Sequence, residues 1–567
     1  MPKSRIPSSH SAECDLRPQT ARFFPLASFR LLAYNPRAMD DARKQSGPVI
    51  LESNDATSAQ SGRMFATPIW AWLLLALGCL ALAIRVWVVL FAAAEPSGTP
   101  ANEAARIAEN LLAGRGFSLD VLGAGGLIPR RAINRDFTAI ILRDETAIFD
   151  RAEYTSRQAP FYPMLLATAY RLFGVGTPEA LLAIGLLQCV VGTAVVLAVV
   201  WLSWSLVPDR PGIGWAAGLI AALYPTHLLM VTRLQPMLWA ALLLTLLLAT
   251  VVSARWRATR ARAVLAGSLA GMLLLVEPVL VLALPVCGLV FWLSESRADR
   301  SGQLPLRRPP LRQLVLMAGI CAVIVTPWTV RNCLVHGRVV PIKSTLGYAF
   351  WQGNNPVSWG TATIPPAAAE LLRHRQDGKL IDANRPGGKD TLRVDDLLLG
   401  PDDYGELAAL SEPGRSRLLG ARAWRFVRAE PGQYAQLCLR RLRYFLLFDE
   451  TDPATADRLS RVSSVAWLVL VFVGLLICGD RRRELWPTWA IFAVVALFHA
   501  LVIVSPWSRF ALEPMTFIWA AWAIGPIAAW RRPIKVYRPG QRARESSGRD
   551  HALKGPHYRL PRRVGAR

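Results

Sequence analysis

Charged residues are scarce in this chain of 567 residues. Asp, Glu, Lys and Arg make up 19% of it, whereas hydrophobic residues make up 53% and include 20 Trp. A soluble enzyme of this length would rarely have such a composition. The shortage of charge therefore argues against a soluble protein and indicates a protein with many membrane-spanning segments.

Cysteine pairs are also missing. The eight Cys are scattered, mostly inside apolar runs, with no C-x-x-C pair and no Cys/His spacing that suits zinc. We therefore expect neither a disulfide framework nor a structural metal. The first 60 or so residues lack the apolar core of a signal peptide and are rich in Ser, Arg and Pro. They predict a disordered cytoplasmic tail over residues 1–65.

Acidic residues are too few to balance the basic ones, which leaves a formal net charge of +25. On one folded face this excess would suggest nucleic acid, but it is concentrated in tails and short loops, so no nucleic-acid partner is expected. Lys and Arg favour the cytoplasmic side of a span. The rule places five segments there: the tail before residue 66, 255–262, 297–312, 480–484 and a basic tail at 531–567. Both termini are then expected in the cytoplasm, and the protein in the cytoplasmic (inner) membrane.

Long apolar runs recur along the chain, and a helix needs about 20 apolar residues to cross the hydrocarbon layer. We expect an all-α polytopic protein with about ten spans: near 66–94, 178–206, 213–232, 234–254, 263–278, 279–295, 313–330, 462–479, 485–505 and 510–530. Two long stretches, 95–177 and 331–461, remain outside the cytoplasm. Their length and the lack of an internal repeat disfavour a transporter and suggest chemistry outside the bilayer.

Both external stretches contain predicted helices. In the first, Ala105, Ala108 and Leu112 have helical spacing, and Gly114 ends the run. A short amphipathic helix that begins between Pro160 and Pro163 is expected to lie at the membrane interface. The second stretch has a Gly/Pro-rich opening, an acidic middle and a helical end, which predict a small α-rich extracytoplasmic domain.

Seven short motifs follow one another in a fixed order. They are Arg85, AENLLAGRGF (108–117), RQAPFYP (157–163), LYP (223–225), TPWTVRN (326–332), GYAFWQGNNP (347–356) and SRFALEP (508–514). This order resembles the polytopic glycosyltransferases of the GT-C type, in the bacterial families related to protein O-mannosyltransferases, aminoarabinose transferases and RgtA/B/C/D-like enzymes. The resemblance runs from about residue 66 to 530. It implies that a sugar passes, with inversion, from a polyprenyl-phosphate-linked donor to an envelope glycan, lipid or protein outside the membrane.

The resemblance also implies a carboxylate base soon after the first span. The acidic motif of these families would fall near residues 100–104, where Glu103 is the acid and Glu95 the nearest reserve. An acid in the first turn of a helix can also serve only to compensate the helix dipole. Gln235 replaces a common Glu, and Glu277 stands in place of a usual Arg. The alternative is therefore a catalytically silent protein that binds a polyprenyl lipid or a partner.

The resemblance implies substrate contacts elsewhere in the motifs. The candidates are Arg157, Tyr162, Arg331, Asn332, Trp351, Asn354, Asn355 and Arg509. Each has a structural alternative: Arg331 and Arg509 can be anchors beside interfacial Trp residues, and a Gly-Asn-Asn-Pro turn can simply fold back over the span ends. Arg440, Arg441 and Arg443 oppose the positive-inside tendency and are a further candidate for phosphate binding. No cofactor is identified, and a metal requirement stays open.

Overall fold

The computed structural model describes residues 68–92, 103–122, 128–129, 152–253, 260–299, 311–365, 394–399, 403, 406–407, 409–451, 455 and 458–524. The two predicted tails and the reserve acid Glu95 lie outside these residues. The described part is mostly helical.

An apolar helix is present in each segment in which a span is predicted. These helices are α3 (Pro68–Trp87) with η1 (Val88–Ala92), α8 (Pro178–Leu206), α9 (Pro211–Leu223) with α10 (Pro225–Leu229) and η3 (Met230–Thr232), α11 (Met237–Val252), α12 (Arg260–Val276), η5 (Pro278–Ala283) with α13 (Leu284–Asp299), α14 (Leu311–His336), α21 (Arg458–Ile477), α22 (Trp486–Leu501), and η8 (Phe510–Leu512) with α23 (Glu513–Ala521).

Length and composition single out fewer of these helices as spans. Among the described residues, Ile69–Phe91, Pro178–Leu206 and Leu311–His336 are long and apolar enough to cross a membrane. A fourth is added if Pro211–Leu223 and Pro225–Thr232, bent by 52° at their junction, form one broken span. The remaining apolar helices are shorter. The helices thus indicate a membrane protein, while the count of about ten spans stays a prediction.

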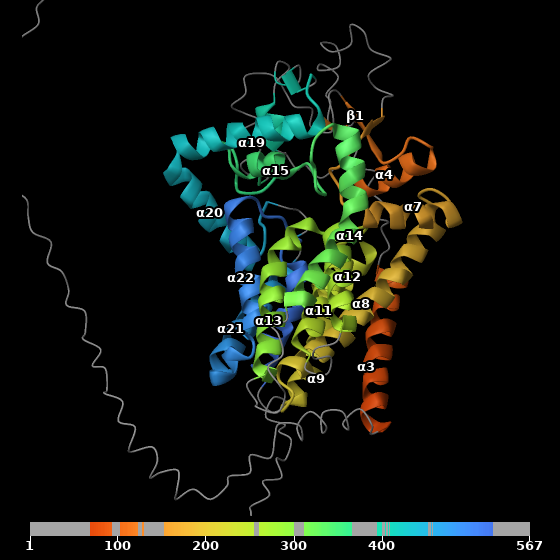
Figure 1. The fold of residues 1–567 in the computed structure, drawn as a ribbon, viewed down its shortest axis with the longest axis vertical. Helices are drawn as coiled ribbons and strands as arrows, with labels where there is room; N and C mark the ends of the chain where they lie inside the picture. The colour runs from red at the N-terminus through yellow and green to blue at the C-terminus, as the bar shows by residue number, and fades with distance from the viewer. Residues whose placement is uncertain are drawn as a thin grey trace, which may run out of the picture. The chain divides into compact units, whose positions relative to one another are not determined.

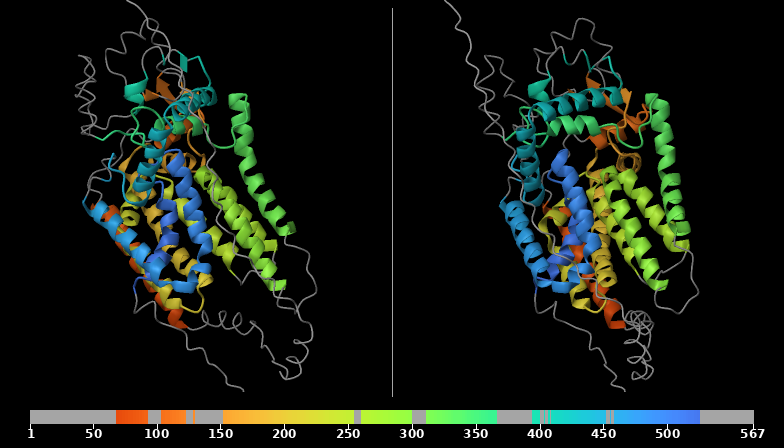
Figure 2. Two further views of the ribbon diagram at one scale, coloured as in Figure 1. Left: turned by 90° about the vertical axis from the view of Figure 1, so that its left-hand side faces the viewer. Right: turned by 60° about the vertical axis from the view of Figure 1, so that its left-hand side comes forward.

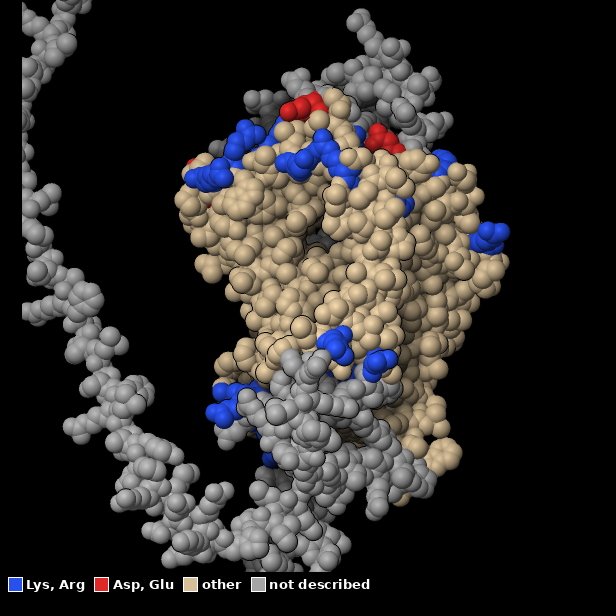
Figure 3. All heavy atoms as spheres, in the orientation of Figure 1, with Lys and Arg blue, Asp and Glu red and all other residues tan. Residues whose placement is uncertain are grey.

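The apolar helices form a bundle in which α8 packs against α3, α9 and α11, and α12 packs against α14 (Figures 1 and 2). Its interior is filled by Ala, Val and Leu side chains of these helices and of α23. On the face drawn in Figure 3, Lys and Arg gather toward the two ends of the described part and leave an uncharged band between them. Such a band suits the hydrocarbon layer, where an unpaired charge is costly.

The first external stretch supplies helices and a small sheet at one end of the bundle (Figure 1). The predicted helices are α4 (Glu103–Leu112) and α7 (Phe161–Phe173). Between them, β1 (Ser118–Leu122) pairs antiparallel with β2 (Ile128–Pro129) and with β3 (Ala152–Tyr154). The expectation of an all-α fold was therefore wrong here. Gly114 and Gly116, with φ of 73° and 70°, turn the chain out of α4 into the extended strand.

The second external stretch has a hydrophobic core of its own. Its helices are α15 (Leu346–Gly353), α17 (Val394–Leu398), α19 (Glu412–Ala429) and α20 (Pro431–Leu446). Tyr348, Trp351, Val394 and Leu419 are among the residues of this core. These helices lie within the stretch for which a small α-rich domain is predicted, and α14 continues past the expected boundary at residue 330 to His336.

A buried arginine repairs the broken helix between α9 and α10. Pro225 has no N–H, so the carbonyl of Ala221 loses its usual helical donor. The Arg85 guanidinium, which has no solvent exposure, donates to this oxygen over 3.1 Å. Two pieces of the motif order, Arg85 and the Tyr-Pro of LYP, are therefore parts of one structural device.

The same device recurs at three other helix ends. Arg262 donates to the carbonyls of Thr250 and Val251 at the end of α11. Arg441 donates to Ala500 and Leu501 at the end of α22, and Arg509 donates to Phe445, Leu446 and Leu447 at the end of α20. Carbonyls in the last turn of a helix have no intrahelical partner, and lipid offers none. These arginines supply the missing donors.

Candidate functional site

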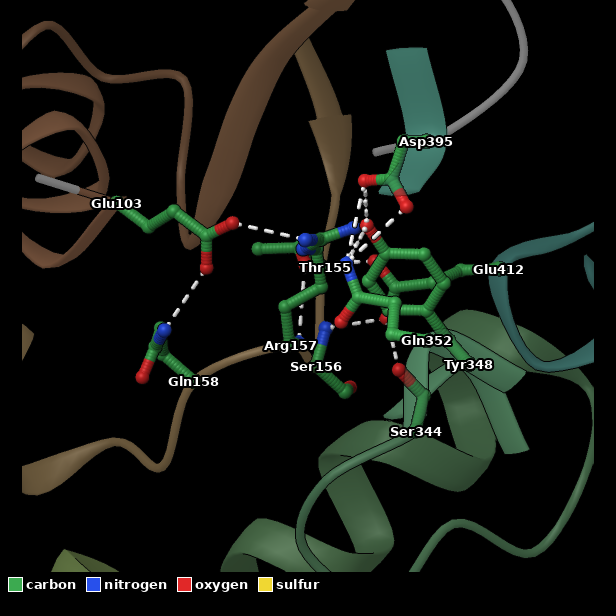
Figure 4. A network of polar contacts seen from close by, with 10 residues as sticks. All are labelled: Glu103, Thr155, Ser156, Arg157, Gln158, Ser344, Tyr348, Gln352, Asp395 and Glu412. Carbon is green, nitrogen blue, oxygen red and sulfur yellow. Dashed lines mark hydrogen bonds and ion pairs between the residues drawn. The ribbon is translucent and has the colours of Figure 1, made fainter. Parts of the chain in front are cut away.

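The candidate base Glu103 is the first residue of α4. Its Oε1 accepts a hydrogen bond from Arg157 Nη2, and its Oε2 accepts one from Gln158 Nε2, both over 2.8 Å (Figure 4). The side chain keeps 35% of its exposure, against 12% for Arg157. Glu103 is therefore a fixed carboxylate that remains accessible from one side.

Arg157 lies near two carboxylates, those of Glu103 and Glu412, and against the ring of Tyr348. Its guanidinium stacks 5.1 Å from the centre of the Tyr348 ring while it pairs with Glu103. Burial by itself would lower the pKa of Arg157, but the charges of Glu103, Tyr348 and Glu412 outweigh burial and raise that pKa. Arg157 is thus a permanent cation whose position depends on the first external stretch and on α15.

A buried carboxylate of the small domain continues this network. The Tyr348 hydroxyl donates to Asp395 of α17, and the Gln352 amide donates to both the Tyr348 oxygen and Asp395 (Figure 4). Asp395 is 7% exposed. Asp395 is therefore connected to Glu103 through two side chains, Tyr348 and Arg157.

Glu412, the first residue of α19, joins three segments that are far apart in sequence. It accepts hydrogen bonds from Thr155 Oγ1 over 2.6 Å, from the Ser156 amide over 2.8 Å, and from Ser344 Oγ. Glu412 is therefore close to the Glu103 site: it bonds to Ser156, and the next residue, Arg157, pairs with Glu103 (Figure 4). Glu412 thereby fixes the segment from which Arg157 projects.

The residues of the TPWTVRN motif are engaged by main-chain groups. Trp328 Nε1 donates to the Ile342 carbonyl, and Asn332 Nδ2 donates to those of Val340 and Ile342. Arg331 donates to the carbonyls of Phe117 and Thr155 over 2.9 and 2.8 Å. The motif therefore folds residues 340–342 back along α14 and fastens the first external stretch to the helix.

The GYAFWQGNNP cluster forms α15 and the turn after it. Trp351 is 4% exposed, and Asn355 Nδ2 donates to its carbonyl over 2.8 Å. Asn354 Nδ2 donates to Phe350 and to Val502, which follows α22. These contacts correspond to the turn that folds back over the helix ends.

The remaining candidates lie apart from Glu103 or inside the protein. The buried Tyr162 hydroxyl donates to Gln188 Oε1 over 3.3 Å, and Gln188 Nε2 donates to the Val231 carbonyl. Arg509 also pairs with the buried Glu513 over 2.8 Å. Arg440 stacks on Trp359, and Arg443 pairs with Glu450. A substrate role for these residues stays a prediction.

The structure brings together four of the predicted residues and adds four that the sequence did not single out. Glu103, Arg157, Arg331 and Asn332 belong to one network, to which Tyr348, Asp395, Ser344 and Glu412 also belong. Tyr348 lies inside the GYAFWQGNNP motif but was not named as a candidate, whereas Asp395, Ser344 and Glu412 meet partners more than 40 residues away in the sequence. The sequence signal that could have drawn attention to Glu412 is the Glu-Pro pair at the start of α19. Within the described residues, no group of three or more His, Cys, Asp or Glu could hold a metal ion.

No protein-family model and no curated protein sequence matches the chain. Solved structures do. The archaeal oligosaccharyltransferase AglB from Archaeoglobus fulgidus, in complex with an inhibitory peptide and a dolichol-phosphate, is 13% identical, with a TM-score of 0.45 over 87% of this chain and 53% of that one. ArnT from Cupriavidus metallidurans, bound to undecaprenyl phosphate, is 14% identical, with a TM-score of 0.32 over 80% of this chain and 78% of that one.

These structural neighbours are GT-C glycosyltransferases, the type that the motif order resembles. The chain spans about half the length of the archaeal enzyme. At these identities and scores the likeness concerns the course of the backbone alone, and no site residue is assigned from it.

Proposed function

We propose that this protein is a membrane glycosyltransferase that moves a sugar from a polyprenyl-phosphate carrier to a hydroxyl of an envelope glycan, lipid or protein outside the cytoplasm. The observation that carries the proposal is the geometry of Glu103. This carboxylate is held by Arg157 and Gln158, is 35% exposed, and occurs where the motif order expects an acid. Fixed orientation and access are what a general base needs.

Glu103 would act in a single displacement. It accepts the proton of the acceptor hydroxyl while the oxygen attacks the anomeric carbon. The bond from that carbon to the phosphate oxygen breaks on the opposite face, its electron pair leaves with the lipid phosphate, and the configuration inverts. Arg157 keeps Glu103 ionised and correctly directed, since an adjacent cation favours the charged form of a carboxylate.

Substituting Glu103→Gln tests the proposal. Glutamine retains the shape and the contact with Arg157 but cannot accept the proton, so turnover should fall by roughly 10²–10⁴-fold. Glu109→Gln, at an exposed position of the same helix, is the matched control and should keep full activity. Release of sugar from labelled polyprenyl-phosphate donors is measured on purified protein. Undiminished turnover by the Glu103 variant would refute the assignment.

One observation favours the second candidate, a catalytically silent lipid-binding protein. Both oxygens of Glu103 already accept hydrogen bonds, which makes the carboxylate a weaker base. A silent protein would bind polyprenyl phosphate but release no sugar from any donor, even without substitution. That result would replace the first proposal with the second.

A further inference from the structure

The segment around Lys343 is fixed on its N-terminal side by α14. The carbonyl of Ile342 accepts hydrogen bonds from Trp328 Nε1 over 3.2 Å and from Asn332 Nδ2 over 3.0 Å. The carbonyl of Pro341 accepts one from Thr329 Oγ1 over 2.8 Å. Three side chains of the TPWTVRN motif therefore hold the backbone immediately before Lys343.

The C-terminal side of Lys343 is fixed as well. The amide of Ser344 donates to the carbonyl of Ser156 over 3.0 Å, and its hydroxyl donates to Glu412. The backbone of Lys343 is thus attached to two separate parts of the molecule, one on each side.

The Lys343 side chain is held much more loosely than its backbone. Among the described residues its ionic partner is Glu277, whose Oε1 lies 3.8 Å from the ammonium, longer than a hydrogen bond. The two side chains are 25% and 15% exposed. Arg331, by contrast, donates to main-chain carbonyls, and Arg157 pairs with Glu103. Lys343 therefore has hydrogen-bonding capacity that a ligand could use.

Lys343 lies close to the Glu103 network. Its neighbour Ser344 is bonded to Ser156, which directly precedes Arg157. Glu277 follows the outer end of α12, where Leu274 packs in one cluster with Ile107 of α4, Ala159 and Ile342. The pairs Glu103–Arg157 and Glu277–Lys343 thus border the same packed cluster.

We infer that the Lys343 ammonium binds the phosphate of the lipid carrier and stabilises the negative charge that develops on it as the bond to the sugar breaks. Glu277 holds the ammonium in place until the phosphate binds. This inference rests on the proposed function and assigns its phosphate contact. A phosphate oxygen can form a charge-assisted hydrogen bond with the ammonium, whereas the Glu277 carboxylate, at 3.8 Å, is too far away to form one. A compact ammonium on a flexible stem can move between the two partners without moving the fixed backbone.

Direct binding of phosphate ligands to the full-length protein in lipid nanodiscs tests the inference without any need for turnover. The probes are a short-chain polyprenyl phosphate, the matching polyprenol and inorganic phosphate. Lys343→Gln should weaken binding of the polyprenyl phosphate about tenfold or more, as expected for one lost charge-assisted contact, while polyprenol binding is unchanged. Lys343→Arg should restore most of the affinity. Arg338→Gln, in the same loop and exposed, is the matched control and should bind normally.

Each result has a distinct meaning. Weakened binding of inorganic phosphate as well would show that the site recognises the phosphate itself, whereas an effect on the lipid alone would show that it needs the carrier; both support the inference. Glu277→Gln should bind the lipid phosphate at least as tightly as the unaltered protein, because a competing carboxylate is removed. If Lys343→Gln binds normally and only unfolds at a lower temperature, the pair is purely structural and the inference fails. If the unaltered protein binds no polyprenyl phosphate, the proposed function fails with it.

Discussion

At the residue scale, Gly192 of α8 leaves the space that the Arg85 guanidinium fills. A Cβ at this position would lie 2.7 Å from Arg85 Nε and 3.1 Å from its Cδ. Gly192→Ala should therefore displace Arg85 from the Ala221 carbonyl and lower the free energy of unfolding by roughly 1–3 kcal/mol. Thermal unfolding in detergent measures the effect.

The chain offers a matched control for this substitution. Gly288 also lies in an apolar helix, α13, and a Cβ there would meet no atom within 4 Å. Gly288→Ala should be neutral or slightly stabilising, because alanine is the better helix former. Equal losses in both variants would mean that Arg85 does not need the space at Gly192.

Arg157 should control the pH dependence of turnover. Arg157→Gln removes the cation beside Glu103, so the carboxylate becomes easier to protonate. The acidic limb of the pH–rate profile should then move to higher pH, while turnover at neutral pH, where an ordinary carboxyl is ionised, should change much less. A uniform loss of activity at every pH would show instead that Arg157 acts by positioning alone.

At the scale of elements, the arginine caps explain why guanidinium groups occur in apolar surroundings. Arg441 joins the end of α22 to the Gly353 carbonyl, and it has no solvent exposure. Arg441→Met should leave these carbonyls without partners and cost about 1–3 kcal/mol of unfolding free energy. Arg443→Met, two residues further along α20, removes an exposed charge and should have a much smaller effect on thermal unfolding.

The elements were largely predictable from the sequence. Apolar runs, Pro at helix starts and Gly at helix ends gave the course of α4, α7 and the apolar helices. The sheet was missed because its strands are two to five residues long, too short for alternation to be recognised. The end of α14 was placed too early, because Arg331 and Asn332 suggested an exit from the membrane although the helix continues past them.

The roles of the charged residues were not predictable in the same way. A motif gives the position of an arginine but not the carbonyl that lacks a donor, because that carbonyl lies on another helix. Arg509 illustrates this: the carbonyls it caps precede it by more than 60 residues. Glu412 and Ser156 likewise meet across 256 residues. Glu103 could be selected as a candidate because the motif order places an acid within a few residues of its position, shortly after the first predicted span.

At the scale of the whole molecule, residues 103–122 and 152–177, residues 337–365 and the C-terminal end of α14 form one polar assembly. Ser156, Ser344 and Glu412 come from three separate segments and meet through direct hydrogen bonds. The TPWTVRN motif joins the same segments from the side of α14. The positions of Glu103 and Lys343 therefore both depend on this assembly rather than on a single loop.

The orientation of this assembly in the membrane gives the last prediction. If the basic loops are cytoplasmic, Val339, which is 79% exposed beside the assembly, must face the outside, whereas Arg483 in η7 (Gly479–Arg483) must face the cytoplasm. A membrane-impermeant maleimide on intact spheroplasts should label Val339→Cys above the background of the unaltered chain. It should label Arg483→Cys only after the membrane is made permeable. The reverse pattern would place Glu103 in the cytoplasm, where an acceptor outside the membrane could not reach it.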